Sequence, residues 1–109
     1  MKPAKGACIV LVTCDSLIQG RAIAKAVVRN RLAACVNLVL GPVQSIYRWK
    51  GKVEVAREHL LVIKTTRKRL KALEREVLRL HSYDVPEFLV LPVSAGSVKY
   101  ISWLNQSVR

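Results

Sequence analysis

One seven-residue segment concentrates more reactive groups than any other part of the chain. It reads His81-Ser82-Tyr83-Asp84-Val85-Pro86-Glu87, and so places an imidazole, a phenol and two carboxylates close together. Pro86 fixes its own φ and biases the preceding residue away from helix, which would hold these groups in a set geometry. Such groups can bind a cation or a polar ligand. The simpler interpretation is a helix end followed by a polar loop.

The soft metal ligands are three cysteines and two histidines: Cys8, Cys14, Cys35, His59 and His81. None form a Cys-x-x-Cys or His-x-x-x-His pair, so no structural zinc site is expected. Cys14 follows an apolar run and should be accessible there, and with His81 it is a candidate ligand for copper or another divalent cation. The other two cysteines fit the core as small residues. An odd cysteine count favours a reducing compartment, and we expect a cytoplasmic protein.

Further candidates depend on the fold. Lys64 ends an apolar strand, where it would contact an anion or simply reach water. Tyr47 and Trp49 alternate on one strand face and would stack on a ligand or, more simply, pack at a subunit interface. Glu54 and Glu58 are expected to pair with basic residues across the strand.

Hydrophobic periodicity predicts the elements that must position these groups. Residues 1–6 are expected to be a disordered tail and residues 7–109 a single domain. Within it we expect strands and helices in the order strand Ala7–Thr13, helix Leu17–Arg31, a strand region Ala34–Trp49 broken at Gly41-Pro42, a turn at 50–52, strand Val53–Thr65, helix Arg67–His81, strand Phe88–Val93 and helix Ser97–Val108.

This βαββαβ order predicts an α+β sandwich of the ferredoxin-like type, with a long β-hairpin arm and a short C-terminal helix. Such a sheet has one face without helices, and its strands should alternate apolar and polar residues. The runs 9–12, 60–63 and 88–91 are instead apolar throughout. Both faces must therefore be covered, and other copies of the chain are the simplest cover. A long apolar arm at a sheet edge also indicates assembly, because such an edge aggregates unless a partner covers it.

The chain carries 19 basic and seven acidic residues, a net charge of +12. Basic residues recur every three or four positions along both long helices, but no aromatic residues or glycine-rich loops accompany them. We therefore interpret these stripes as solvated surfaces and do not expect a nucleic-acid partner. An accessory that binds nucleic acid, with steep salt dependence, remains an open alternative. No apolar run is long enough to predict a membrane span.

Five segments together resemble the CutA divalent-cation tolerance proteins, over roughly residues 7–108. They are Arg31-Leu32-Ala33-Ala34-Cys35-Val36-Asn37, Ser45-Ile46-Tyr47-Arg48-Trp49-Lys50-Gly51, Ile63-Lys64-Thr65-Thr66, His81-x-Tyr83-x-x-Pro86-Glu87 ahead of Leu91-Pro92-Val93, and Tyr100-x-x-Trp103-Leu104.

The resemblance implies a ferredoxin-like homotrimer joined through the hairpin, a link to copper and other divalent cations, and no catalytic activity. It also implies an inter-subunit pocket for a small ion or metabolite, built from Tyr47, Trp49, Lys64, His81, Tyr83 and Glu87. The copper ligands proposed for some members are a first-strand cysteine and two adjacent histidines. His81 matches one of the histidines, but Leu80 stands at the other and Val12 at the cysteine position.

Two further alternatives remain open. One is a trimeric signal-transduction module, because the family's fold and trimer look like those of the nitrogen-regulatory proteins. The other is a small acyl-phosphate hydrolase. That activity would need an arginine in an anion-binding loop after the first strand, and Thr13–Gly20 contains none.

Overall fold

Strands and helices follow the βαββαβ order, with short additions at both ends. The computed structural model describes residues 1–109. Its elements are β1 (Lys2–Pro3), β2 (Ala7–Cys14), α1 (Leu17–Arg29), β3 (Cys35–Leu38), β4 (Val43–Trp49), β5 (Lys52–Thr66), the 3₁₀ turn η1 (Arg67–Arg69), α2 (Leu70–Leu80), β6 (Leu89–Pro92), β7 (Ala95–Gly96) and α3 (Val98–Ser107).

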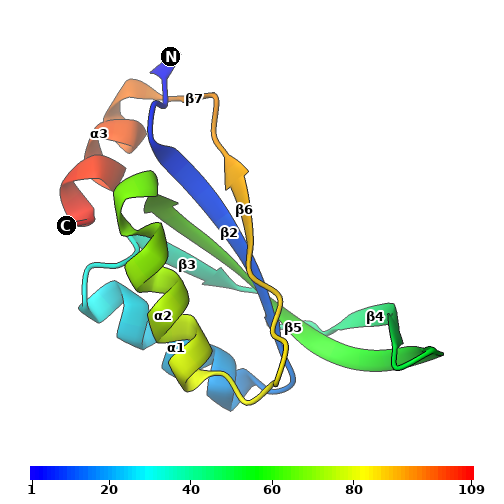
Figure 1. Cartoon of the computed structure of the whole chain (residues 1–109). Helices are drawn as coiled ribbons and strands as arrows, with labels where there is room; N and C mark the ends of the chain where they lie inside the picture. The colour runs from blue at the N-terminus through cyan, green and yellow to red at the C-terminus, as the bar shows by residue number, and fades with distance from the viewer.

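The main sheet is antiparallel and has the order β3-β5-β2-β6. Helices α1 and α2 lie side by side on one of its faces (Figure 1). This arrangement confirms the ferredoxin-like fold expected from the sequence. None of the helices combines the length and the hydropathy that a membrane-spanning segment needs.

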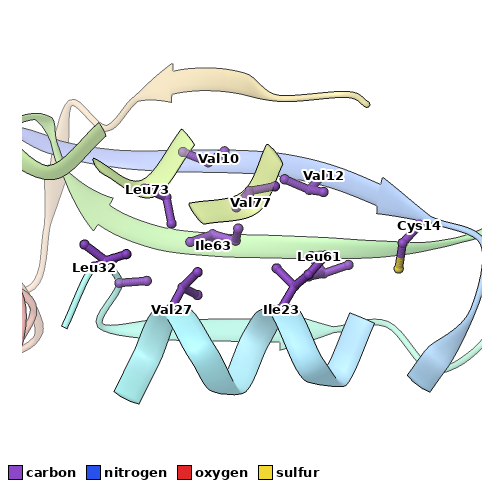
Figure 2. Close-up of a cluster of buried hydrophobic side chains, with 11 residues drawn as sticks. Val10, Val12, Cys14, Ile23, Val27, Leu32, Leu61, Ile63, Leu73 and Val77 are labelled. Atoms are coloured by element: carbon purple, nitrogen blue, oxygen red, sulfur yellow. The ribbon is translucent and has the colours of Figure 1, made fainter. Parts of the chain in front are cut away.

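The core lies between the sheet and these two helices (Figure 2). Even-numbered residues of β2 and, in the main-sheet half of β5, the odd-numbered residues 61–65 point into it, because side chains alternate along a strand. The fully buried residues at its centre are Val10, Val12, Ile23, Val27, Leu61, Ile63, Leu73 and Val77. The helices contribute at spacings of four residues, which places their apolar side chains on one face.

The opposite face of the sheet is also apolar and is only partly covered. We call this the open face; its apolar side chains are Ile9, Leu11, Leu60, Val62, Leu89 and Leu91. Helix α3 covers one end, where Ile101 and Leu104 pack against Ala4 and Ala7. Toward the other end the side chain of Leu89 remains 57% exposed. The sequence expectation of apolar residues on both faces is thus confirmed.

The hairpin arm is formed by β4 and the first half of β5 and extends beyond the body of the domain (Figure 1). Strand β5 is continuous through the arm and the main sheet. Its partner is interrupted between β3 and β4 around Gly41-Pro42, as proline in an edge strand predicts. Lys50 and Gly51, with φ of 50° and 80°, make the two-residue turn. Ile46, Val53 and Val55 are each at least 60% exposed along the arm.

Residues 1–6 differ from the expected disordered tail. Lys2 and Pro3 pair with Gly96 and Ala95, and the amide of Ala4 donates to the carbonyl of Ser94 at 3.0 Å. The Ala4 side chain is buried under α3. The segment is therefore held by backbone hydrogen bonds to a part of the chain about 90 residues away.

Both long helices end slightly earlier than expected. Helix α1 stops at Arg29, since Arg31 adopts a left-handed φ of 58°. Helix α2 stops at Leu80, because His81 has an extended backbone. This early end frees His81 to begin the loop that carries the reactive groups.

Candidate functional site

A pocket of about 570 Å³ lies where the arm leaves the main sheet. Three segments meet there: the end of β2, the facing residues of β4 and β5, and the loop after α2. The lining residues are Thr13, Ser45, Ile46, Tyr47, Trp49, Glu58, Tyr83, Asp84, Val85 and Glu87. Thr13, Ser45, Tyr47, Trp49 and Glu58 share the side of the strands that forms the open face. The pocket is therefore continuous with that apolar surface.

The centre of the pocket is a hydrogen bond between a phenol and a carboxylate. Tyr83 Oη donates to Glu58 Oε2 at 2.8 Å. Burial, followed by this bond to Glu58, raises the pKa of Tyr83 well above its ordinary value. Glu87 lies on the same wall, and burial together with the Glu58 charge raises the pKa of its carboxyl. In both groups burial is the larger cause of the raised pKa, and the nearby Glu58 carboxylate adds to it.

His81 anchors the loop that carries Tyr83 and Glu87. Its ring is buried, and its Nε2 lies 2.7 Å from the carbonyl oxygen of Thr13. A carbonyl can only accept, so Nε2 carries the hydrogen, and Nδ1 accepts from the Tyr83 amide at 3.1 Å. The His81 and Tyr83 rings also pack with centroids 4.7 Å apart. Both ring nitrogens are thus occupied in positioning the loop.

Cys14 does not have the accessibility expected of it. The side chain is fully buried, and its thiol contacts the carbonyl oxygens of Ser16 at 3.3 Å and His59 at 3.8 Å. Burial raises the pKa of the thiol, which disfavours the thiolate that binds metals. Helix α1 covers this strand end at Gly20, where an added Cβ would lie 3.1 Å from Cys14 Sγ. A thiol packed in this way belongs to the core.

Lys64 lies apart from the pocket. It shares the open side of β5 with Glu58 but is six residues along the strand, about 20 Å at ~3.3 Å per residue. Its Nζ contacts Cys35 Sγ at 3.9 Å. Cys35 is partly exposed there, whereas the sequence predicted a core residue. The structure therefore brings together Tyr47, Trp49, Tyr83 and Glu87, places His81 just behind them, and leaves Lys64 and Cys14 outside.

Glu58 is the site residue that sequence reasoning missed. It was expected to pair with a basic residue, but its cross-strand neighbour is Val43, and the molecule's single ion pair joins Arg79 to Glu76 on α2. Glu58 is 7% exposed and bonds Tyr83 instead. The sequence signal that could have identified Glu58 is its position as a carboxylate just before the apolar run 60–63.

The pocket is the acidic part of a basic molecule. Three of the chain's seven carboxylates, those of Glu58, Asp84 and Glu87, line it. An oxygen-rich, negatively charged pocket suits a cation better than an anion. Within one chain, however, no three His, Cys, Asp or Glu side chains converge closely enough to enclose a metal ion. A metal held here would need further ligands.

A family model for the "CutA1 divalent ion tolerance protein" matches residues 8–107. Among curated relatives, the divalent-cation tolerance protein CutA of Thermus thermophilus is 46% identical over 99 residues, which cover 91% of this chain and 95% of that protein. The chloroplastic CutA of Arabidopsis thaliana is 45% identical over 101 residues, 93% of this chain. The present chain spans only 55% of the Arabidopsis protein, about half its length.

Solved structures agree. The Cut A1 protein of Thermus thermophilus superposes with a TM-score of 0.92 at 44% identity, covering 94% of this chain and 99% of that one. CutA1 of Oryza sativa also superposes with a TM-score of 0.92, at 41% identity, covering 96% of this chain and 95% of that one. Names of relatives include a chloroplastic and a periplasmic protein, so the cytoplasmic location stays a prediction. The chain belongs to the CutA1 divalent ion tolerance family.

Proposed function

We propose that three copies of the chain assemble over their open faces and bind a divalent cation in the carboxylate pocket at each subunit boundary. The position of the pocket supports this proposal. It lies at the uncovered end of the open face, so a copy that covers the apolar strands also approaches Glu58. The number three comes from the resemblance to CutA proteins.

Burial of apolar surface supplies the drive for assembly. The open face and the arm expose large apolar side chains such as Ile46, Val55 and Leu89, each by more than half. Removing apolar surface from water gains about 25 cal/mol per Å². A second copy could also bring the ligands that one chain lacks for a closed metal site.

Carboxylate and phenol oxygens would hold the cation, and its charge would offset the repulsion between Glu58 and Glu87. Oxygen ligands favour Mn²⁺ or Mg²⁺ over softer ions. Copper would draw on imidazole, and His81 could supply it only by giving up a hydrogen bond to Thr13 or Tyr83. We therefore propose an oxygen-ligated cation first and copper second, with Cys14 not among the ligands.

Calorimetric titration of the purified chain with Mn²⁺, Zn²⁺ and Cu²⁺ tests the proposal. Glu58→Gln should lower the affinity for the preferred cation by at least about tenfold, since it removes one negative charge from the ligand set. Glu74→Gln, which removes an exposed carboxylate from α2, is the matched control and should bind as the wild type does. Equal binding by both variants, or no saturable binding by the wild type, would overturn the cation site.

A small anion at Lys64 is the second candidate, favoured by the position of this ammonium on the open face. An anionic metabolite would then compete with assembly or bind at its boundary, and Lys64→Ala would abolish that binding while leaving cation titrations unchanged. Loss of cation binding in Lys64→Ala would contradict the separation of the two sites.

A further inference from the structure

The helix layer carries more than half of the molecule's net positive charge, +7 of +12. Helices α1 and α2 with η1 contain nine basic and two acidic residues. The buried sides of the helices, centred on Ile23 and Val27 in α1 and on Leu73 and Val77 in α2, set which residues face outward. Those on the outer side are all exposed, and we call them the basic face: Arg21, Lys25, Arg29, Lys68, Lys71, Arg75 and Arg79.

Separate in the sequence, the two basic stripes become one surface in the fold. Their helices lie side by side on the sheet (Figure 1). Within each helix the charges recur every four residues, about 6 Å at ~1.5 Å per residue, and adjacent helix axes are about 8–10 Å apart. The result is a compact grid of cations. Only Arg79 has an ion-pair partner, Glu76. The other six are left without compensating carboxylates.

We propose that the basic face binds the phosphate backbone of duplex nucleic acid without reading its sequence. About 12 Å of duplex axis carries about seven negative charges, which matches the grid in number and extent. Phosphate contacts from Lys and Arg are sufficient for non-sequence-specific binding. This surface lies on the opposite side of the sheet from the open face, so assembly over the open face leaves it free.

The composition of the face favours a duplex over single-stranded nucleic acid and over an anionic membrane. Single-stranded nucleic acid is usually held by stacking on aromatic side chains, and helices α1 and α2 contain none. Attachment to an anionic membrane strengthens with apolar side chains that enter the lipid. Here most apolar side chains of both helices are turned into the core, and only three large ones, Ile18, Val28 and Leu78, are exposed beside the seven cations. Positive charge therefore dominates the outer side, and positive charge is what a duplex backbone requires.

Fluorescence anisotropy with a short random-sequence DNA duplex tests this directly on the full chain. The wild type should bind at low salt, with an affinity that falls about a thousandfold between about 50 and 200 mM salt, as expected for six phosphate contacts. Two duplexes of unrelated sequence should bind equally well. Absence of binding at low salt, or binding that does not respond to salt, would overturn the proposal.

Two variants that each lose three positive charges distinguish binding by the basic face from binding that depends only on net charge. Arg21→Gln/Lys25→Gln/Arg75→Gln should lower the slope of log affinity against log salt by about three and weaken binding more than tenfold. The control, Lys5→Gln/Lys99→Gln/Arg109→Gln, removes three exposed charges at the α3 end and should bind as the wild type does. Equal losses in both, or tighter binding to phosphatidylserine vesicles than to the duplex, would refute the assignment.

Discussion

At the scale of single residues, the site is governed by where negative charge is buried. Glu58, Tyr83 and Glu87 meet at the pocket, and His81 fixes the loop behind them through both ring nitrogens. Loop position and pocket chemistry are therefore coupled: any ligand that recruits His81 must break its hydrogen bond to Thr13 or to Tyr83. Two predictions at this scale follow from buried polar contacts.

The first concerns the pH dependence of the fold. Because the folded pKa of Glu87 is raised above 4.5, the folded state favours the protonated carboxyl. This contribution to stability is complete below the unfolded pKa and is lost as pH rises through the folded pKa. Glu87→Gln should therefore raise the Tm at pH 7 in metal-free buffer and give little gain at pH 4. Thermal denaturation at both pH values, with Glu74→Gln as the control, measures this. A gain that is larger at pH 4 would contradict it.

The second concerns a buried hydroxyl. Thr65 Oγ1 donates to the carbonyl oxygen of Leu32 at 2.6 Å, and the side chain is fully buried. Thr65→Val keeps the shape but removes the donor, and should lower the free energy of unfolding by about 1–2 kcal/mol. Thr66→Val changes the adjacent residue, whose hydroxyl makes no capping bond, and should cost less. Urea denaturation of both variants checks the difference.

At the scale of elements, hydrophobic periodicity was sufficient to locate every strand of the main sheet and all three helices. Periodicity is a local signal, and it failed where contacts are distant. Residues 2–3 were expected to be disordered because nothing nearby predicts their pairing with residues 95–96. Cys14 was expected to be accessible because the sequence does not reveal that α1 closes over it at Gly20. Glu58 was missed because its partner, Tyr83, lies in another segment.

Helix α2 provides a prediction about packing. Leu73 is fully buried against the sheet, whereas Leu78 on the same helix is 45% exposed. Leu73→Ala should reduce the free energy of unfolding by about 2–5 kcal/mol, through lost apolar contact and a cavity. Leu78→Ala removes the same atoms from a surface position and should cost well under half as much. Chemical denaturation of the two variants compares them; equal losses would mean that α2 packs differently.

At the scale of the whole molecule, the two sides of the sheet have opposite characters. One side is a basic helix layer and the other is an apolar surface with an acidic pocket at its end. The assembly and cation binding proposed for one side and the duplex binding proposed for the other would therefore not compete for the same surface.

Assembly gives the prediction at this scale. Leu91→Glu places a charge on the open face, where burial by another copy would be costly, and should shift the protein to single chains. Ile18→Glu introduces the same charge on α1, at a side chain already 82% exposed, and should leave the subunit count unchanged. Sedimentation velocity of both variants reports the mass. An oligomer that tolerates Leu91→Glu would place the interface elsewhere.

The continuity of β5 between the main sheet and the arm restricts how the length of the arm can change. Successive side chains of a strand alternate between its two sides. One residue inserted near Glu58 would therefore leave the core in register but turn the arm over, so that Tyr47 and Trp49 would face away from the pocket. Insertions or deletions of two residues preserve the sides and only move the tip by about 7 Å. Arms of different length in this fold should therefore differ by even numbers of residues per strand.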